Sequence, residues 1–452
     1  MNTAVERALT LLAAVVALIA MITAMVLTPR MFTGEPAGAF TAASAALPDT
    51  PSTQVKDLDP QAPKPDQALL TAQLDAILAT KPDKTSFTAQ VVDVPSGEVL
   101  YNRNGEQPGT PASSLKVATA IAALDTLGGQ RQLATTVTLE GKTLVLHGGG
   151  DVLLGAGVSD PAHPKGYAGL QTLAEQVDQV LADRGIGEVE LVLDDSLFGT
   201  AHTNKDWDKS LFTSNNIAPV YPIALYAGRA TENTRSAYSQ DAAARVLDSF
   251  AAQLKVKVHR GERGARQGGE EIARVLSAPL REQINYMLLV SDNYLTETMG
   301  RLVAVERGMD PAQAGAAVQA VAAAHGASEL SLVDASGLAA KNKISPAALT
   351  ALLRAAAVSP KPELRELVYS LPVGGYNGTL RQRFTDDASQ GQVRAKTGSL
   401  AGVATLTGMT LTADGRLLAF SIFAAHPDGA LAPHKQTIDQ AVRAIHACGC
   451  RP

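Results

Sequence analysis

The feature that most constrains this chain is an S-x-x-K motif, Ser113 to Lys116, which lies at the start of a long apolar run. Residues 117–127 have the composition of a buried helix, so we expect Ser113 in its first turn and Lys116 one turn on, on the same face. Alanine and leucine side chains around an amine disfavour its charged form. A neutral Lys116 can then accept the proton of Ser113, while the N–H groups at the helix start favour negative charge on the hydroxyl oxygen.

A four-residue pattern of this kind also arises by chance in most chains of this length. The alternative interpretation is that Ser113 or Ser114 only caps a helix and that Lys116 is an ordinary solvated lysine. The motif therefore needs further motifs in support before it indicates chemistry.

Two such motifs follow in chain order. Ser291-Asp-Asn293 is predicted to lie in the loop after a helix over residues 280–290, and Lys396-Thr-Gly398 is predicted on a strand. Penicillin-binding proteins and serine β-lactamases share the set S-x-x-K, S-D-N and K-T-G. Each motif is weak alone, but their joint occurrence in this order indicates a serine enzyme that forms an acyl intermediate.

Residues 286–424 further resemble the low-molecular-mass class C penicillin-binding proteins, D-alanyl-D-alanine carboxypeptidases that also act as endopeptidases. Asp334-Ala-Ser-Gly-Leu338 is similar to that family's D-G-S-G-L segment, and Leu371 to Leu380 is similar to its L-P-x-A-G-x-D-G-T-L segment. The resemblance implies an α+β fold of the penicillin-binding/β-lactamase-like transpeptidase type, with an antiparallel sheet flanked by helices and an inserted domain. The insert between the first and second motifs is short for the family.

The resemblance also implies roles for the catalytic side chains. Ser113 would attack the carbonyl of the penultimate D-alanine of a peptidoglycan stem peptide, and Lys116 would take its proton. Ser291 would relay a proton toward the leaving amine, and Asn293 would hold the substrate amide. β-Lactam antibiotics would act as covalent inhibitors through the same serine.

Substrate recognition would fall to the third motif and its neighbour. Lys396 would supply positive charge beside the substrate carboxylate, and Thr397 would bind that carboxylate, with Gly398 beside it on the strand. The backbone N–H groups of Ser113 and Ser399 would form the oxyanion hole. No metal or other cofactor is required by this chemistry.

The N-terminal part of the chain carries a candidate membrane anchor. Ala8 to Leu27 is free of charged residues and long enough to cross a bilayer as a helix, with Arg7 before it and Arg30 after it. The small residues at 42–46 lie too far past this stretch for a usual cleavage site. We therefore expect an uncleaved single-pass anchor with the catalytic domain outside the cytoplasm, the alternative being a secreted protein after signal cleavage.

The remaining chain divides by composition. We expect an anchor over 1–30, a Pro/Ala/Thr-rich linker over 31–66, a peptidase domain built from 67–129 and 229–452, and an inserted domain over 130–228. Periodicity predicts helices over 68–78, 170–181, 241–254, 280–290, 312–324 and 437–447, and strands over 88–94, 98–101, 135–139, 143–147, 189–193, 393–396, 403–411 and 416–424.

Composition narrows the functional classes. The net charge of −5 and the absence of a basic cluster interleaved with aromatic residues argue against nucleic acid as a partner. Two cysteines, Cys448 and Cys450, close the chain; they could pair with each other or form a flexible tail, and His446 beside them makes a poor metal site without further ligands.

Two competing functions remain open at this stage. A serine β-lactamase or related esterase uses the same acylation residues but needs an activated water for fast deacylation, which the sequence does not reveal. A catalytically inactive protein that binds the cell wall is the alternative from a different class, although every named catalytic side chain is present.

Overall fold

The computed structural model of the protein describes residues 61–79, 84–426 and 432–448. These residues all belong to one compact unit, Leu58–Pro452. The predicted anchor at Ala8 to Leu27 and most of the predicted linker lie outside the described residues, as does Cys450. Among the helices that are described, none combines the length and hydropathy that a bilayer crossing needs.

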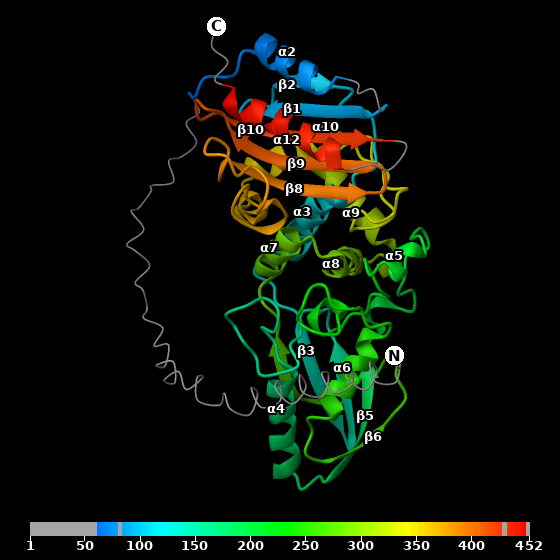
Figure 1. Ribbon diagram of the computed structural model, residues 1–452. Helices are drawn as coiled ribbons and strands as arrows, with labels where there is room; N and C mark the ends of the chain where they lie inside the picture. The colour runs from blue at the N-terminus through cyan, green and yellow to red at the C-terminus, as the bar shows by residue number, and fades with distance from the viewer. Residues whose placement is uncertain (1–60, 80–83, 427–431, 449–452) are drawn as a thin grey trace, which may run out of the picture. The chain divides into compact units, whose positions relative to one another are not determined.

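A five-stranded antiparallel sheet in the order β2-β1-β10-β9-β8 supports the site (Figure 1). It joins distant parts of the chain, since β1 pairs with β10 from Ser86↔Ala425 to Asp93↔Leu418. The predicted early hairpin and the predicted late strands are therefore neighbours in one sheet. The bounds are β1 (Ser86–Asp93), β2 (Val99–Arg103), β8 (Val393–Leu400), β9 (Val403–Leu411) and β10 (Leu417–Ala425).

Side chains of this sheet alternate between two cores, because successive residues of a strand point to opposite faces. Along β10, Phe420 and Ile422 belong to the core under α2 and α12, whereas Ala419 and Phe423 belong to the core that contains α10. Figure 1 shows α12 on one face of the sheet and α10 on the other, which confirms the predicted sheet flanked by helices. The helix bounds are α2 (Gln67–Ile77), α10 (Pro346–Ala357) and α12 (Ala432–Ala447).

The helix that follows the S-x-x-K motif, α3, is buried on all sides. Of its 12 residues, 10 are buried, and it packs against α8, α9 and α10. A helix that is apolar all round is expected to be enclosed by the fold, and the alanines of α3 allow close approach of its neighbours. The bounds of this layer are α3 (Lys116–Leu127), α7 (Leu280–Val290), α8 (Asn293–Glu306) and α9 (Ala314–Ala324).

The prediction that the S-D-N motif lies in a loop is wrong for Asn293, because this residue begins the helix α8, which the sequence did not predict. Asp292 is the N-cap of α8, where its side chain accepts a hydrogen bond from the backbone N–H of Leu295 at 2.8 Å. An aspartate at this position stabilises a helix start, because it satisfies one of the unpaired N–H groups of the first turn. The S-D-N motif therefore joins two helices, with Asn293 already inside the second.

A second, mixed sheet in the order β6-β5-β4-β3-β7 is built mainly from the insert. β3 pairs antiparallel with β4 and β7, whereas β4, β5 and β6 run parallel. Figure 1 shows α4 and α6 beside this sheet. The bounds are β3 (Ala134–Glu140), β4 (Thr143–Gly148), α4 (Leu170–Asp183), β5 (Glu188–Asp194), α6 (Ala242–Ala251), β6 (Lys257–Arg260) and β7 (Glu270–Leu276).

The second sheet continues beyond residue 228, where the inserted domain was expected to end. β6 and β7 follow that boundary in the sequence, yet both are hydrogen-bonded members of the second sheet, and α6 packs against α4 and β5. The pairing of β7 with β3, from Ala134↔Leu276 to Leu139↔Glu270, is a long-range contact that no local pattern in the sequence announces. The second sheet therefore extends to Leu276.

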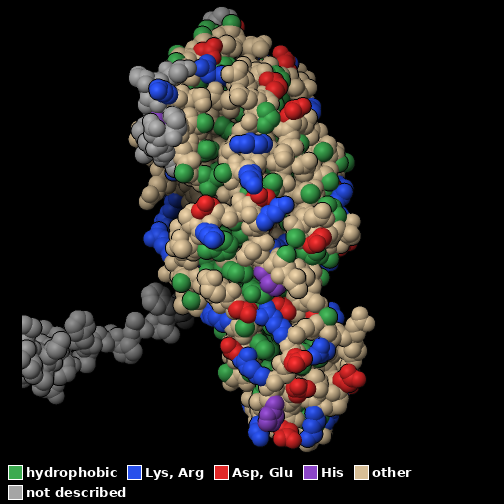
Figure 2. Space-filling view, turned by 90° about the vertical axis from the view of Figure 1, so that its right-hand side faces the viewer, with side chains coloured by type: hydrophobic (Ala, Val, Ile, Leu, Met, Phe, Trp, Pro, Cys, Tyr) green, Lys and Arg blue, Asp and Glu red, His purple; other side chains and the backbone are tan. Residues whose placement is uncertain are grey.

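The surface charges of the described chain are mixed. The face in Figure 2 shows Lys and Arg side chains interspersed with Asp and Glu.

The C-terminal cysteine Cys448 is buried at the end of α12 and is disulfide-bonded. Several short elements complete the described chain. The short elements are η1 (Ala112–Leu115), η2 (Ser196–Phe198), α5 (Ser210–Thr213), η3 (Tyr226–Gly228), η4 (Pro311–Gln313), α11 (Pro362–Glu366), η5 (Leu367–Ser370) and η6 (Gly378–Leu380).

Candidate active site

The predicted nucleophile lies in a strained turn immediately before α3. Ala112 adopts a left-handed backbone with φ of 47°, which is uncommon for a residue with a side chain. Ser113 follows in the short helix η1, and α3 begins only at Lys116, so the serine precedes the helix rather than forming its first turn. The spacing of three residues still places the two side chains together, because η1 leads directly into α3.

Lys116 is fully buried and its amine contacts three oxygen acceptors. Its Nζ lies 3.1 Å from the Oγ of Ser113, 2.8 Å from the Oδ1 of Asn293 and 2.7 Å from the backbone oxygen of Ser336. The alternative of a solvated lysine is thus excluded, since its exposed fraction is 0%. Burial lowers the pKa of Lys116 from its usual value to about 8.

Acidic groups around Lys116 act against this effect of burial. The negative charges of Asp334, Glu297 and Asp292 each favour the ammonium form and so raise the pKa of Lys116. The result is an amine with a pKa of about 8 that contacts a serine hydroxyl. A general base of this kind needs a pKa close to the working pH.

Two glycines allow other segments to approach the strained turn. A Cβ on Gly398 would lie 2.1 Å from the Oγ1 of Thr405 and 2.7 Å from the backbone oxygen of Pro111. A Cβ on Gly337 would lie 1.9 Å from the backbone oxygen of Ala112. Both distances are far below van der Waals contact, so the turn that carries Ser113 is enclosed by two positions that admit only glycine without a shift of the backbone.

Ser114, the alternative nucleophile, serves the structure of this turn. Its Oγ is buried and lies 2.7 Å from the Oγ1 of Thr405, which in turn donates a hydrogen bond to the backbone oxygen of Pro111 at 2.9 Å. Ser113 is half-buried and has Lys116 as its hydrogen-bond partner. The geometry therefore distinguishes the two serines and favours Ser113 as the reactive one.

The S-D-N motif approaches the amine of Lys116 from the end of α7. Ser291 adopts a left-handed backbone with φ of 58°, which turns the chain from α7 into α8. Asn293 accepts from Lys116 through Oδ1 and donates through Nδ2 to the backbone oxygen of Asn216 at 2.9 Å. Within the described residues, the hydroxyl of Ser291 makes no hydrogen bond. The buried carboxyl of Asp292 has a raised pKa because of its burial.

The K-T-G motif lies on β8, at the edge of the first sheet. Lys396 is fully buried, and its Nζ donates to the backbone oxygen of Thr397 at 2.9 Å. Burial and the positive charge of Lys116 together hold the pKa of Lys396 well below its usual value. The hydroxyl of Thr397 donates to that of Thr379 at 3.0 Å, while the neighbouring Ser399 is exposed.

Some of the predicted site residues contact one another directly, and others only lie nearby. Direct hydrogen bonds join Ser113, Lys116 and Asn293, and Lys396 lies near enough to Lys116 for their charges to interact. Gly398 and Ser399 follow on the same strand. Within the described residues, no hydrogen bond joins the hydroxyl of Ser291 or of Ser399 to these amines.

Sequence reasoning missed the buried acids that shape the loop after residue 333. Glu297, from α8, accepts hydrogen bonds from the backbone N–H groups of Ala335 and Ser336 at 3.1 and 2.7 Å. Burial, together with the nearby charge of Asp334, raises the pKa of Glu297 to about 7. A sequence signal was nevertheless present, because Glu297 lies four residues after Asn293. A helix over this stretch places the two side chains on one face, so a prediction of α8 would have placed Glu297 on the face of Asn293.

Asp334 accepts several of the hydrogen bonds that hold the same loop in place. Its carboxylate accepts hydrogen bonds from the backbone N–H groups of Gly337 and Ala339 at 2.9 and 2.7 Å, and from the side chain of Asn342 at 2.7 Å. The indole Nε1 of Trp207, from the insert, donates a further bond at 2.9 Å. A buried carboxylate with four donors is well satisfied, and it fixes the loop whose Ser336 oxygen contacts Lys116.

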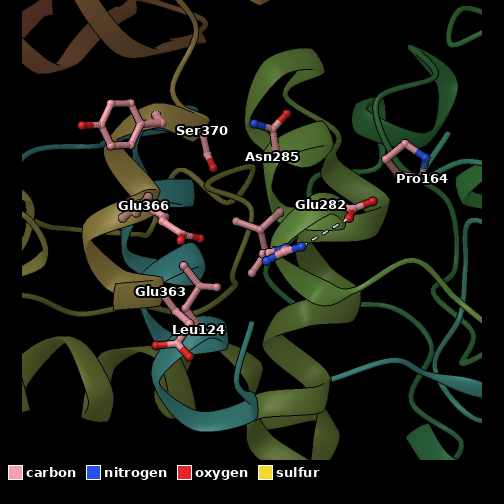
Figure 3. A pocket seen from close by; sticks show the side chains of 11 residues that line it. Leu124, Pro164, Glu282, Asn285, Glu363, Glu366 and Ser370 are labelled. Carbon is pink, nitrogen blue, oxygen red and sulfur yellow. Dashed lines mark ion pairs between the residues drawn. The ribbon is translucent and has the colours of Figure 1, made fainter. Parts of the chain in front are cut away.

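A separate pocket of about 380 Å³ opens at the other end of α7. Figure 3 shows Glu363 and Glu366 on one side and Asn285 and Glu282 on the other. The residues that line it include none of the predicted site residues.

In the part of the chain that is described, no group of three or more His, Cys, Asp or Glu side chains is arranged to hold a metal ion. The imidazole Nδ1 of His446 forms a hydrogen bond with the backbone oxygen of Leu411 at 2.7 Å.

A family profile and two curated relatives each match most of this chain, and all three are described as carboxypeptidases. The profile of the D-Ala-D-Ala carboxypeptidase 3 (S13) family matches residues 70–244 and 227–446. Carboxypeptidase DacB of Mycolicibacterium smegmatis is 34% identical over 96% of this chain and 96% of its own length. A carboxypeptidase of Mycobacterium tuberculosis is 32% identical over 92% of each chain.

Among solved structures, penicillin binding protein 4 of Haemophilus influenzae superposes with a TM-score of 0.66 at 20% identity. The match covers 84% of this chain and 99% of that one. The likeness shows that the two share a fold, and it agrees with the mixed α+β architecture of two sheets and helices described above.

Proposed function

The chain belongs to the D-Ala-D-Ala carboxypeptidase 3 (S13) family, and from this premise we propose that it hydrolyses the terminal peptide bond of peptidoglycan stem peptides through an acyl-enzyme on Ser113. It is a low-molecular-mass class C penicillin-binding protein with serine D-alanyl-D-alanine carboxypeptidase activity. The observation that carries the assignment of residues is the contact of the buried Lys116 amine with the Ser113 hydroxyl at 3.1 Å.

Acylation begins with proton transfer from Ser113 to neutral Lys116. The serine oxygen forms a bond to the carbonyl carbon of the penultimate D-alanine, and the backbone N–H groups of Ser113 and Ser399 receive the negative charge on the carbonyl oxygen. The C–N bond then breaks as the proton taken up by Lys116 passes through Ser291 to the departing D-alanine amine, which leaves Lys116 neutral again. Water completes the cycle by hydrolysing the ester, which restores the serine hydroxyl.

Recognition of the substrate carboxylate rests on Lys396 and Thr397. Among the described residues, no carboxylate forms an ion pair with Lys396, and its ammonium form is disfavoured by burial and by Lys116. A buried cation without a counter-charge is costly, so an anionic ligand beside it gains from completing the pair. The C-terminal carboxylate of a D-Ala-D-Ala peptide supplies that charge, and Asn293 holds the preceding amide.

Release of D-alanine tests this proposal directly. A fragment that comprises residues 61–452 should release D-alanine from an acyl-D-Ala-D-Ala peptide, and preincubation with penicillin should abolish the release. The Ser113→Ala variant should be inactive, whereas Ser114→Ala should keep a measurable rate. Rapid hydrolysis of penicillin without release of D-alanine would instead indicate a β-lactamase, and neither reaction would indicate an inactive wall-binding protein.

We also propose that Ala8 to Leu27 anchors the protein in the cell membrane with its catalytic residues outside the cytoplasm. The support is the uncharged length of this segment and the location of peptidoglycan. Protease added to intact spheroplasts should then degrade the catalytic part while a cytoplasmic control protein survives. Recovery of a soluble chain that begins between residues 42 and 47 would show signal cleavage instead.

A further inference from the structure

The insert reaches the peptidase site through a corner at Asn215 and Asn216. The backbone oxygen of Asn216 accepts the bond from Asn293 Nδ2 at 2.9 Å, while Asn293 Oδ1 accepts from Lys116 at 2.8 Å. An asparagine amide has a donor end and an acceptor end, and these two bonds determine which end faces which partner. If the Asn216 oxygen moved away, the amide of Asn293 would lose the contact that holds its acceptor end toward Lys116.

Asn215 fixes the conformation of this corner. Asn215 adopts a left-handed backbone with φ of 58°, a conformation that asparagine tolerates better than most residues. Its side chain accepts from the backbone N–H of Tyr238 at 3.0 Å and donates to the backbone oxygen of Ser236 at 3.1 Å. On the other flank, the N–H of Asn216 donates to the oxygen of Leu211 at 2.9 Å. The corner is thus fixed from both sides.

The same stretch of the insert contacts the site a second time. Asn204 donates to the backbone oxygen of Val333 at 2.6 Å, and Trp207 donates to the buried carboxylate of Asp334 at 2.9 Å. Asp334 fixes the loop whose Ser336 oxygen accepts from Lys116. Two of the three acceptors around the Lys116 amine are therefore supported by residues 204–216, although this stretch lies outside all three sequence motifs.

We propose that the Asn215–Asn216 corner is a positioning element of the peptidase site, which orients the Asn293 amide and thereby directs Lys116 toward Ser113. One hydrogen of the Asn293 amide bonds Asn216, and the second stays available for the substrate. The insert is thus part of the catalytic apparatus rather than only an appended lobe. This inference rests on the proposed function, because it concerns the rate of acylation at Ser113.

The test compares rates of acylation by a fluorescent penicillin in matched variants. Asn215→Ala removes both side-chain bonds and disfavours the left-handed backbone, so its acylation rate constant should fall at least about tenfold, the equivalent of one hydrogen bond to a charged group. Asn215→Gly keeps that backbone accessible and should give an intermediate rate. The control is Asn104→Ala, because Asn104 is exposed and also left-handed, with φ of 49°, but it contacts no site residue; its rate should stay within about twofold of wild type.

The fraction of protein that becomes labelled separates positioning from folding. A purely structural role would reduce the labelled fraction and leave the rate constant of the labelled molecules unchanged, and that result would overturn the proposal. So would an Asn215→Ala rate within about twofold of wild type, or an equal loss in Asn104→Ala. Failure of the wild type itself to be acylated would overturn the proposed function, which is a distinct outcome. If Asn215→Ala does not fold, the same limit applies to Asn215→Gly, and a rate of this variant within about twofold of wild type would overturn the proposal.

Discussion

The rate of acylation should follow the deprotonation of Lys116 as the pH rises. Burial lowers the pKa of this amine to about 8, and only the neutral form can accept the proton of Ser113. The neutral fraction is about 1% at pH 6, about 10% at pH 7 and about 90% at pH 9. The acylation rate constant should therefore rise about tenfold between pH 6 and 7, and less than about twofold between pH 8 and 9.

The assay is the pH profile of labelling by fluorescent penicillin, with a thermal melt at each pH to exclude unfolding. Glu297 could mimic the profile, because its pKa is raised to about 7, so the profile is repeated with Glu297→Gln. Removal of a negative neighbour disfavours the ammonium form, which should move the rise to lower pH without abolishing it. A flat profile between pH 6 and 8 in the wild type, or loss of the rise in Glu297→Gln, would refute Lys116 as the base.

Three further predictions concern the site. Lys116→Arg should slow acylation at least about a hundredfold, because arginine keeps its proton, and retention of most of the rate would mean another base. Gly398→Ala should lower the free energy of unfolding in urea by about 1–3 kcal/mol, because the new methyl would lie 2.1 Å from Thr405 Oγ1. Gly157→Ala is the control, because a Cβ there meets open space, and equal losses in the two variants would show that the close approach at Gly398 is not the cause. An acyl-D-Ala-D-Ala peptide with an amidated C-terminus should lose at least about tenfold in kcat/KM; equal cleavage would argue for an endopeptidase.

The sequence predicted elements best where a local pattern controls them. The helix over 280–290 was predicted with the bounds that α7 has, because an apolar repeat follows Pro279 and ends at the left-handed Ser291. The helix α8 was missed because Asp292 and Asn293 are typical of loops, and the capping role of Asp292 becomes evident only once the helix is recognised. The extent of the second sheet was missed because β7 pairs with a strand more than a hundred residues away.

For the peptidase site, the motifs identified the catalytic side chains but not the backbone groups that hold them in position. Ser113, Lys116 and Asn293 could be singled out because their residue types and order carry a known chemistry. The backbone oxygens of Ser336 and Asn216 could not, since a backbone oxygen leaves no signature in a sequence. Their positions depend on tertiary contacts such as the bond from Trp207 to Asp334.

Mass spectrometry of the penicillin adduct shows which hydroxyl is acylated. Wild-type protein should gain the mass of one penicillin, and peptide mapping should place this mass on Ser113, the half-buried hydroxyl that contacts Lys116. The Ser114→Ala variant should give the same adduct, because that hydroxyl bonds Thr405 within the fold. A stable adduct on Ser114 or Ser291, or no adduct on the folded wild type, would show that Ser113 is not the nucleophile.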